Sequence, residues 1–220
     1  MKKLTNFLKK NVRKVDSYLP RPIFHPWRMS KNEKKTFDEL IKKSSYYLEF
    51  GSGGSTIRAL MKSNTKIYSV DSSSEWIDFM RKYKIIRHFE GKRLDFFHVN
   101  IGPTIEWGNP ADDSSKSLYP NFSSQVFEKI NPEMLDTIFI DGRFRVACIL
   151  KTIIHLHNSG NYHNKIIMVH DFWNREYYHE VLRYLKIMRK IDTFGVFCLK
   201  ENLDINDVKE DYNHFKFDIR

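Results

Sequence analysis

The sequence predicts an α/β protein with a Rossmann-like, doubly wound and mostly parallel sheet of about seven strands, with helices on both faces. First, short runs rich in β-branched and aromatic residues alternate along the chain with stretches of helical periodicity. Second, a glycine-rich turn follows the first of these runs. Third, two short apolar runs near the C-terminus predict an antiparallel hairpin that closes the edge of the sheet.

Each predicted element follows from this alternation. The β-rich runs predict strands at 46–50, 66–70, 94–99, 137–140 and 165–169. The intervening periodic stretches predict helices at 56–62, 74–81, 123–130, 146–157 and 176–188. The terminal hairpin is expected within KIDTFGVFCLK, around Gly195, and the long loop 101–124 is expected to serve function or to be disordered.

Composition and cysteine content bound the class of protein. The chain has 220 residues, of which 41% are hydrophobic, enough for one sizeable core. No apolar run approaches the roughly 20 residues of a membrane span, and the N-terminus lacks the apolar core of a secretory signal. Cys148 and Cys198 both lie in apolar runs, which indicates buried thiols rather than a disulfide. We therefore expect a cytoplasmic protein.

Positive charge is concentrated at the N-terminus. Residues 1–35 hold eleven Lys or Arg and two acidic residues, whereas the remainder holds 26 and 25. We predict an amphipathic helix at 4–15 and a Pro-rich connector, which together form a segment 1–29 ahead of the main domain 30–220. Ser30 and Glu33 form a capping-box pattern that opens a helix to about Lys43. The basic arm favours peripheral contact with an anionic membrane, nucleic acid or a phosphorylated substrate, and the alternative is a solvated helix.

The stretch YYLEFGSGGSTIRAL predicts a strand, a glycine-rich turn and a helix. Gly51, Gly53 and Gly54 permit tight turning and close approach of a ligand, and the free N–H groups of the helix favour a negative ligand group. Asp71 ends the next strand, 22 residues after Glu49, where a carboxylate can accept both hydroxyls of a ribose. The alternative for Asp71 is an ordinary helix cap.

The turn departs from the dinucleotide fingerprint, because Thr56 stands where the last glycine of G-x-G-x-x-G belongs. Glu49-Phe50-Gly51-Ser52-Gly53 instead resembles the first motif, E/D-x-G-x-G, of class I S-adenosylmethionine-dependent methyltransferases. The resemblance runs in motif order from about Tyr46 to Lys200. It implies S-adenosylmethionine as cofactor, bound by Glu49, Gly51, Ser52, Gly53, Ser55, Thr56, Asp71, Ser72, Asn100 and Ile101.

Two further strand ends carry candidate catalytic groups. Asp141 follows the fourth strand, and His170 and Asp171 follow the fifth, so all three should meet at the carboxyl edge of the sheet. EFGSGGST, EWGNP, FIDGRFR and VHDF together resemble bacterial and viral sugar O-methyltransferases of polysaccharide biosynthesis. This resemblance implies a sugar hydroxyl on a glycan or glycan precursor as acceptor, contacted by Trp107, Arg143 and Arg145.

A sugar hydroxyl is a weak nucleophile, so it needs a base or a cation that lowers its pKa. Asp141 is the first choice for the base, because a partly buried carboxylate is a stronger base. Asp141 and Asp171 could instead hold Mg²⁺, or Mn²⁺ in view of the neighbouring His170. The alternative functions are an RNA methyltransferase and a non-catalytic nucleotide-binding module. Nucleic acid is the weaker partner, since the body of the chain is nearly neutral.

Overall fold

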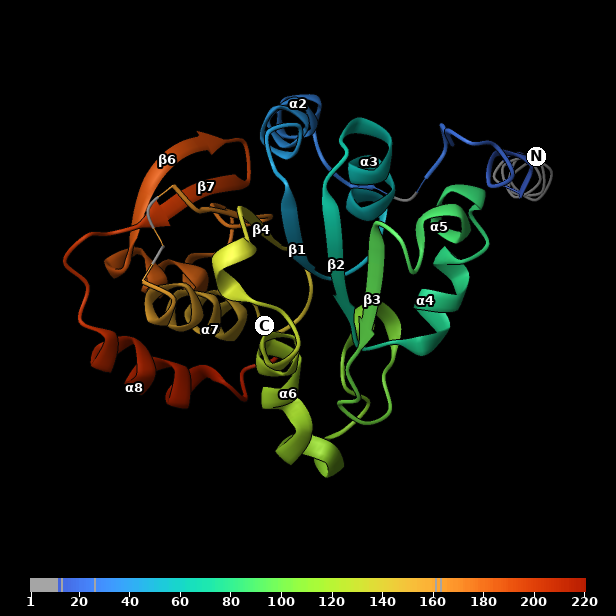
Figure 1. Cartoon of the computed structure of the whole chain (residues 1–220). Helices are drawn as coiled ribbons and strands as arrows, with labels where there is room; N and C mark the ends of the chain where they lie inside the picture. The colour runs from blue at the N-terminus through green and yellow to red at the C-terminus, as the bar shows by residue number, and fades with distance from the viewer. Residues whose placement is uncertain (1–11, 13, 26, 161, 163) are drawn as a thin grey trace.

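The computed structural model describes residues 12, 14–25, 27–160, 162 and 164–220 (Figure 1). The predicted helix 4–15 lies largely outside these residues. The described α-helices are α2 (Lys31–Ile41), α3 (Gly54–Lys62), α4 (Ser74–Met80), α5 (Lys84–Phe89), α6 (Tyr119–Ser124), α7 (Arg145–Asn158) and α8 (Ile205–Phe215). The strands are β1 (Tyr46–Phe50), β2 (Lys66–Asp71), β3 (Leu94–His98), β4 (Thr137–Ile140), β5 (Ile166–Val169), β6 (Leu185–Ile191) and β7 (Phe194–Leu199).

The strands form one seven-stranded sheet in the order β3-β2-β1-β4-β5-β7-β6. Strands β1 to β5 pair in parallel, and β7 runs antiparallel to both of its neighbours, β5 and β6. The predicted fold class, including the terminal hairpin, is confirmed. The strand order switches direction between β1 and β4, because β2 and β3 are added on one side of β1 and β4 and β5 on the other. In open α/β sheets, ligands bind beside the carboxyl ends of the strands at such a switch point.

Helices cover both faces of the sheet, because successive side chains of a strand point to opposite faces (Figure 1). Tyr47 and Phe139 pack under α2 and α3, in a core that also receives side chains of α4 and α5. Leu48 and Phe50 point the other way, into the core formed with α6, α7 and α8. All four of these strand side chains are fully buried.

The predicted helix at 176–188 is wrong in its second half. A 3-10 helix covers Glu176–Arg183, and the chain then enters β6, which pairs along its length with β7. The apolar spacing of this segment suits a helix, but hydrogen bonds to a distant strand decide its conformation. Two further helices, α5 and α8, lie where the sequence pattern predicts none.

The hairpin turns at Asp192 and Thr193 rather than at Gly195. Asp192 adopts a left-handed φ of 48°, as tight two-residue hairpins require. Gly195 lies inside β7, where a Cβ atom would come within 2.3 Å of the Phe197 ring. The glycine therefore makes room for an aromatic ring and does not form the turn.

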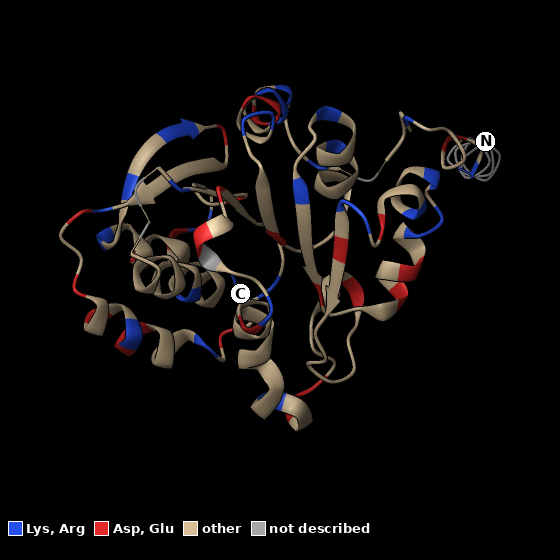
Figure 2. Ribbon diagram, viewed as in Figure 1, with Lys and Arg blue, Asp and Glu red and all other residues tan. Residues whose placement is uncertain are grey.

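The predicted loop 101–124 contains short 3-10 helices at Glu106–Gly108 and Asp113–Leu118 before α6, and the predicted helix 123–130 is divided between α6 and a 3-10 helix at Gln125–Glu128. Cys148 is buried and Cys198 half-buried, and both are free thiols. Charged residues of both signs are distributed over the helices (Figure 2). None of the helices in the described residues has the length and apolar character needed to cross a membrane.

The predicted capping box at the start of α2 is confirmed and also anchors the hairpin. Ser30 Oγ accepts the Glu33 N–H at 3.2 Å, and Glu33 Oε2 accepts the Ser30 N–H at 2.7 Å. The other carboxylate oxygen of Glu33 accepts the N–H and the hydroxyl of Thr193, at 3.0 and 2.7 Å. Glu33 is almost completely buried, so its side chain fixes α2 against the turn between β6 and β7.

We expect Glu33→Ala to lower the free energy of unfolding by about 2–4 kcal/mol, because several buried donors lose their acceptor. Glu39→Ala is the matched control in the same helix, since Glu39 forms an exposed ion pair with Arg189 and its loss should cost less than about 1 kcal/mol. Chemical denaturation of both variants measures the difference. Equal effects would contradict the anchoring role of Glu33.

Candidate cofactor and catalytic site at the carboxyl edge of the sheet

The turn after β1 packs directly against the turn after β4. Gly51 has a φ of +97°, and a Cβ atom on it would lie 2.8 Å from the backbone N and Cα of Gly142. Both glycines are therefore needed for contact between the two turns. Gly53 differs, because a Cβ atom placed there meets no atom within 4 Å. The turn thus has a side that packs against the protein and a side that is open to a ligand.

Glu49 lies beneath this turn and is fully buried. Its carboxylate accepts hydrogen bonds from Tyr47 at 2.9 Å and from Ser55 and Ser69 at 2.7 Å each, and a fourth from the Thr56 hydroxyl. Burial raises the pKa of Glu49 to about 7 even though these hydroxyls favour the charged form.

The hydroxyls around Glu49 come from Tyr47 in β1, from Ser69 in β2 and from the first turn of α3. Thr56 also accepts the Gly53 N–H at 2.9 Å, so the glycine turn is tied to the same carboxylate. The sequence pattern predicts cofactor contacts for Glu49, Ser55 and Thr56. In the structure their side chains contact one another, so we infer that these residues shape the turn from below.

Asp71 ends β2 beside the turn and is nearly buried. One of its oxygens accepts the N–H and the hydroxyl of Ser52, at 3.0 and 2.7 Å, and the other accepts the Ser73 N–H at 3.0 Å. Burial raises the pKa of Asp71, and the hydrogen bonds from Ser52 and Ser73 oppose that rise. The carboxylate is thus held at the edge of the turn, where the sequence pattern places a ribose-binding group.

The loop after β3 closes against this edge. A Cβ atom on Gly108 would lie 3.1 Å from the hydroxyl of Ser72, so the loop passes close to the end of β2. Asn100 is exposed and its side chain accepts the Gly102 N–H at 2.9 Å. Ile101 is buried in the core, so only its backbone can face a ligand.

Two arginines contact this loop. The Arg28 guanidinium lies 4.6 Å from the ring centre of Trp107, whose side chain is 65% exposed. Arg143 Nη1 donates to Asn109 Oδ1 at 3.0 Å. Arg143 follows β4, and Asn109 lies in the loop after β3. The strands β1 and β2 lie between β3 and β4 in the sheet, so β3 and β4 are about 14 Å apart. The Arg143 contact therefore spans the carboxyl ends of β1 and β2.

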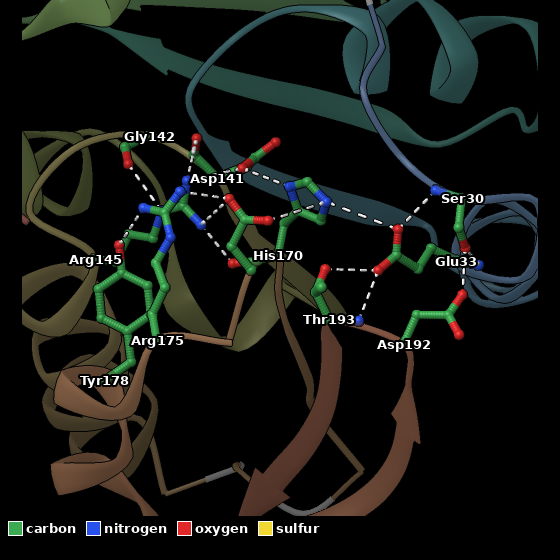
Figure 3. A network of polar contacts seen from close by, with 11 residues as sticks. Ser30, Glu33, Asp141, Gly142, Arg145, His170, Arg175, Tyr178, Asp192 and Thr193 are labelled. Atoms are coloured by element: carbon green, nitrogen blue, oxygen red, sulfur yellow. Dashed lines mark hydrogen bonds and ion pairs between the residues drawn. The ribbon is translucent and has the colours of Figure 1, made fainter. Parts of the chain in front are cut away.

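Asp141, His170 and Asp171 come together as the sequence pattern predicts. Figure 3 labels Asp141 and His170 with the residues around them. His170 Nδ1 lies 3.0 Å from Asp141 Oδ1, and His170 Nε2 lies 3.7 Å from Asp171 Oδ1. Nε2 also lies 3.8 Å from Glu33 Oε2, so the capping box of α2 faces the same imidazole. Glu33 is a site residue that sequence reasoning missed, since its capping role hid its tertiary contact.

Two arginines neutralise the aspartates. Arg145 is almost fully buried, with Nη2 3.0 Å from Asp141 Oδ1 and Nη1 3.8 Å from Asp171 Oδ2. It also donates to the backbone carbonyls of Gly142 and His170. Arg175, which the sequence pattern does not single out, pairs with Asp171 at 2.7 Å. The guanidinium of Arg145, which the sequence analysis assigns to the acceptor, thus faces protein groups and forms internal ion pairs.

The charges of the cluster are balanced when His170 is protonated. Burial works against the charge of Asp141, but Arg145 and then His170 outweigh it and lower the pKa of Asp141. Burial alone would lower the pKa of His170, yet the hydrogen bond and charge of Asp141 raise it. The expectation that burial makes Asp141 a stronger base is therefore wrong, because neighbouring cations hold the carboxylate in its charged form.

No family model matches the chain, and no curated protein matches its sequence. Among solved structures, a methyltransferase-like protein from Silicibacter pomeroyi superimposes with a TM-score of 0.76 at 23% identity, covering 88% of this chain and 98% of that one. A putative caffeoyl-CoA O-methyltransferase from Staphylococcus aureus gives 0.51 at 15% identity, with 90% and 91% covered. The methyltransferase PaMTH1 of Podospora anserina, bound to SAH, gives 0.50 at 14%, with 79% and 80% covered. These similarities show that the chain has the class I methyltransferase fold.

The raised pKa of His170 predicts a pH dependence of stability. A group whose pKa rises on folding stabilises the folded state below its unfolded value, 6.5, and loses that contribution as pH rises through the folded value. The free energy of unfolding should therefore fall between pH 6 and pH 8.5 more steeply in the wild type than in His170→Gln. Denaturation at several pH values measures the free energy of unfolding of both proteins. Glu49, whose pKa is also raised, contributes equally to both, so its contribution cancels in the difference between them. A shallower fall in the wild type would contradict the prediction.

Proposed function

We propose that this chain is an S-adenosylmethionine-dependent methyltransferase whose acceptor is a sugar hydroxyl on a glycan or glycan precursor. The observation that carries the proposal is the convergence of polar groups at the carboxyl ends of β1, β2, β4 and β5, where the strand order switches direction. The SAH bound to the Podospora anserina methyltransferase, which shares the fold, supports the choice of cofactor.

The residues around the first turn fit such a cofactor. The open space at Gly53 allows close approach to the backbone, and we propose that the methionine part lies along Gly51, Ser52 and Gly53. Asp71 would accept the ribose hydroxyls, because its carboxylate is already oriented by Ser52 and retains accepting capacity. Ser72, Asn100 and the backbone of Ile101 would flank the adenine.

The bound cofactor supplies an electrophilic methyl group on sulfur with a good leaving group, so the protein must chiefly position the acceptor. Asp141 is suited to this task. Its Oδ1 is held by His170 and Arg145, whereas no hydrogen bond to its Oδ2 is found among the described residues. The side chain is 26% exposed. We propose that Oδ2 accepts the hydrogen bond of the acceptor hydroxyl and takes its proton as the new C–O bond forms.

The charge balance favours a base without a metal ion. Asp141, His170 and Asp171 offer ligand atoms within 4.8 Å of one another, a spacing that could suit a metal ion. The Arg145 guanidinium, however, already contacts both aspartates. A divalent cation would have to displace this buried charge, so we propose that Arg145 and His170 perform the neutralising role instead.

The mouth of the site suits a sugar. Trp107 presents an exposed ring, and aromatic faces stack on the apolar faces of sugar rings. Arg143 offers guanidinium N–H groups, since the only hydrogen bond found for its side chain among the described residues is to Asn109. No described carboxylate lies within 4 Å of Arg143, whose Nε is buried without a partner. We propose that Trp107 and Arg143 orient the acceptor above the methyl group.

Calorimetry with S-adenosylhomocysteine tests the cofactor site. Asp71→Ala should weaken binding at least about 100-fold, because two charge-assisted hydrogen bonds of about 1.5–3 kcal/mol each are lost. Ser52→Ala is the control, since it removes the hydroxyl that orients Asp71 but keeps the carboxylate, and it should weaken binding less. Unchanged affinity in Asp71→Ala would remove Asp71 from the site. Tighter binding of NAD than of S-adenosylmethionine would overturn the proposed cofactor.

Transfer of isotopically labelled methyl groups to a panel of sugars, glycans and RNA tests the reaction. Asp141→Asn should reduce turnover about 10²–10⁴-fold on the sugar acceptor while leaving S-adenosylhomocysteine affinity nearly unchanged. Asp171→Asn should have a smaller effect, because its carboxylate pairs with Arg175 and Arg145. EDTA should leave activity unchanged. Loss to EDTA with recovery in Mn²⁺ or Mg²⁺ would contradict the metal-free mechanism, and transfer to RNA alone would contradict the sugar acceptor.

A further inference from the structure

A basic groove lies at the amino-terminal edge of the sheet, at the opposite end of the strands from the candidate site. It consists of two adjoining cavities of about 620 and 460 Å³ that share Met61, Ser63, Asn64 and Arg93. We call this surface the basic groove. Its cationic lining residues are Arg21, Lys42, Lys62, Lys66, Lys84 and Arg93, and no acidic residue lines it.

Most of this positive charge is uncompensated. Lys66 pairs with Asp95 at 2.7 Å, but none of the other five cations has a carboxylate within 4 Å among the described residues. Arg93 is fixed in place by the Asn64 side chain at 3.2 Å and by the Leu60 carbonyl at 3.0 Å. Its Nε is buried without a hydrogen-bond partner. Unpaired cations around a hollow surface attract an anionic group.

An apolar rim borders the basic groove. Of thirteen large apolar side chains that are exposed in the described residues, six lie between residues 12 and 24, so this short segment is unusually rich in them. They are Val12, Val15, Tyr18, Leu19, Ile23 and Phe24. Pro20 and Arg21, in the middle of this segment, line the groove itself. In Figure 2 the N-terminal segment lies next to α5, where several basic residues are located.

Internal hydrogen bonds hold this segment in place. Asp16 is buried, and its two carboxylate oxygens accept the N–H groups of Ile23 and Phe24, each at 2.7 Å. The Ser17 carbonyl accepts the Lys84 N–H at 2.7 Å, which ties the segment to the start of α5. Ile23 and Phe24 are nevertheless 71% and 53% exposed. Their exposure therefore results from a fixed backbone conformation that presents them outward.

We propose that this face binds an anionic lipid surface, with lipid phosphates in the basic groove and Leu19, Ile23 and Phe24 inserted among the acyl chains. Exposed apolar side chains beside unpaired cations are the combination that binds the membrane interface. Burial of the apolar side chains among the lipids adds to the attraction between the cations and the anionic headgroups. A nucleic acid would be attracted by the cations alone. The proposal is independent of the proposed catalytic function, whose residues lie at the other edge of the sheet.

Flotation of the full chain with vesicles tests the proposal. Vesicles of phosphatidylcholine with about 30% phosphatidylglycerol should bind the chain, and vesicles of phosphatidylcholine alone should bind it at least tenfold more weakly. Binding should weaken as salt rises from about 50 to 300 mM. Arg21→Gln combined with Lys84→Gln should weaken binding about fivefold for each charge removed. Ile23→Ser combined with Phe24→Ser should weaken it at least tenfold.

Matched controls lie on β6, the outermost strand on the side of the sheet opposite β3. Ile187 and Met188 are 50% and 51% exposed, and Lys186 beside them is also exposed. Ile187→Ser combined with Met188→Ser, and Lys186→Gln alone, should leave vesicle binding unchanged. Unchanged thermal midpoints show that each variant is folded.

Three results would overturn the proposal. These are no binding of the full chain to anionic vesicles, equal loss of binding in the β6 controls, and wild-type binding by the Ile23→Ser and Phe24→Ser double variant. A short RNA that binds the groove and displaces the vesicles, with sensitivity to Arg21→Gln and Lys84→Gln alone, would identify a nucleic-acid site instead.

Discussion

Three carboxylates meet at the ends of β4, β5 and the start of α2, and the site depends on how their charges are compensated. Asp141, Asp171 and Glu33 surround His170, and Arg145 and Arg175 complete the balance (Figure 3). Removing charges from water is costly unless they are paired, so the loss of one partner would leave another buried charge uncompensated. The contacts also link β4, β5, α2 and the turn between β6 and β7. The same pairing lowers the pKa of Asp141 and engages only its Oδ1, the arrangement on which the proposed contact of Oδ2 with an acceptor rests.

A second buried carboxylate shapes the glycine-rich turn after β1. Glu49 collects four hydroxyls beneath the glycine turn, and Gly51 allows that turn to contact the turn after β4. Asp71 is fixed by Ser52 at the same edge. The motif therefore serves two purposes: some of its residues build the turn, and others remain available to a ligand. Separate measurements of stability and of cofactor affinity distinguish these purposes.

The two ends of the strands differ in electrostatic character. At the carboxyl ends of the strands, the acidic and basic side chains are paired with one another. At the amino edge, the cations of the basic groove are largely unpaired and stand beside exposed apolar side chains. With the proposed lipid contact at the amino-terminal ends of the strands, the candidate site at their carboxyl ends stays accessible to an acceptor. The boundary between residues 1–29 and 30–220 remains a prediction, although Asp16 and Arg28 already make ordered contacts.

The sequence by itself determined the strand and helix alternation, the turn at Gly51–Gly54 and the acids at the strand ends, because these depend on local periodicity and on the rule that parallel strands end at one edge. Tertiary structure decided the rest. Residues 185–188 form a strand because β7 pairs with them, and Gly195 is a glycine because the Phe197 ring covers it. Glu33 and Arg175 joined the cluster, and the pKa of Asp141 was lowered rather than raised. Such effects depend on distances between segments far apart in the chain, which local patterns do not contain.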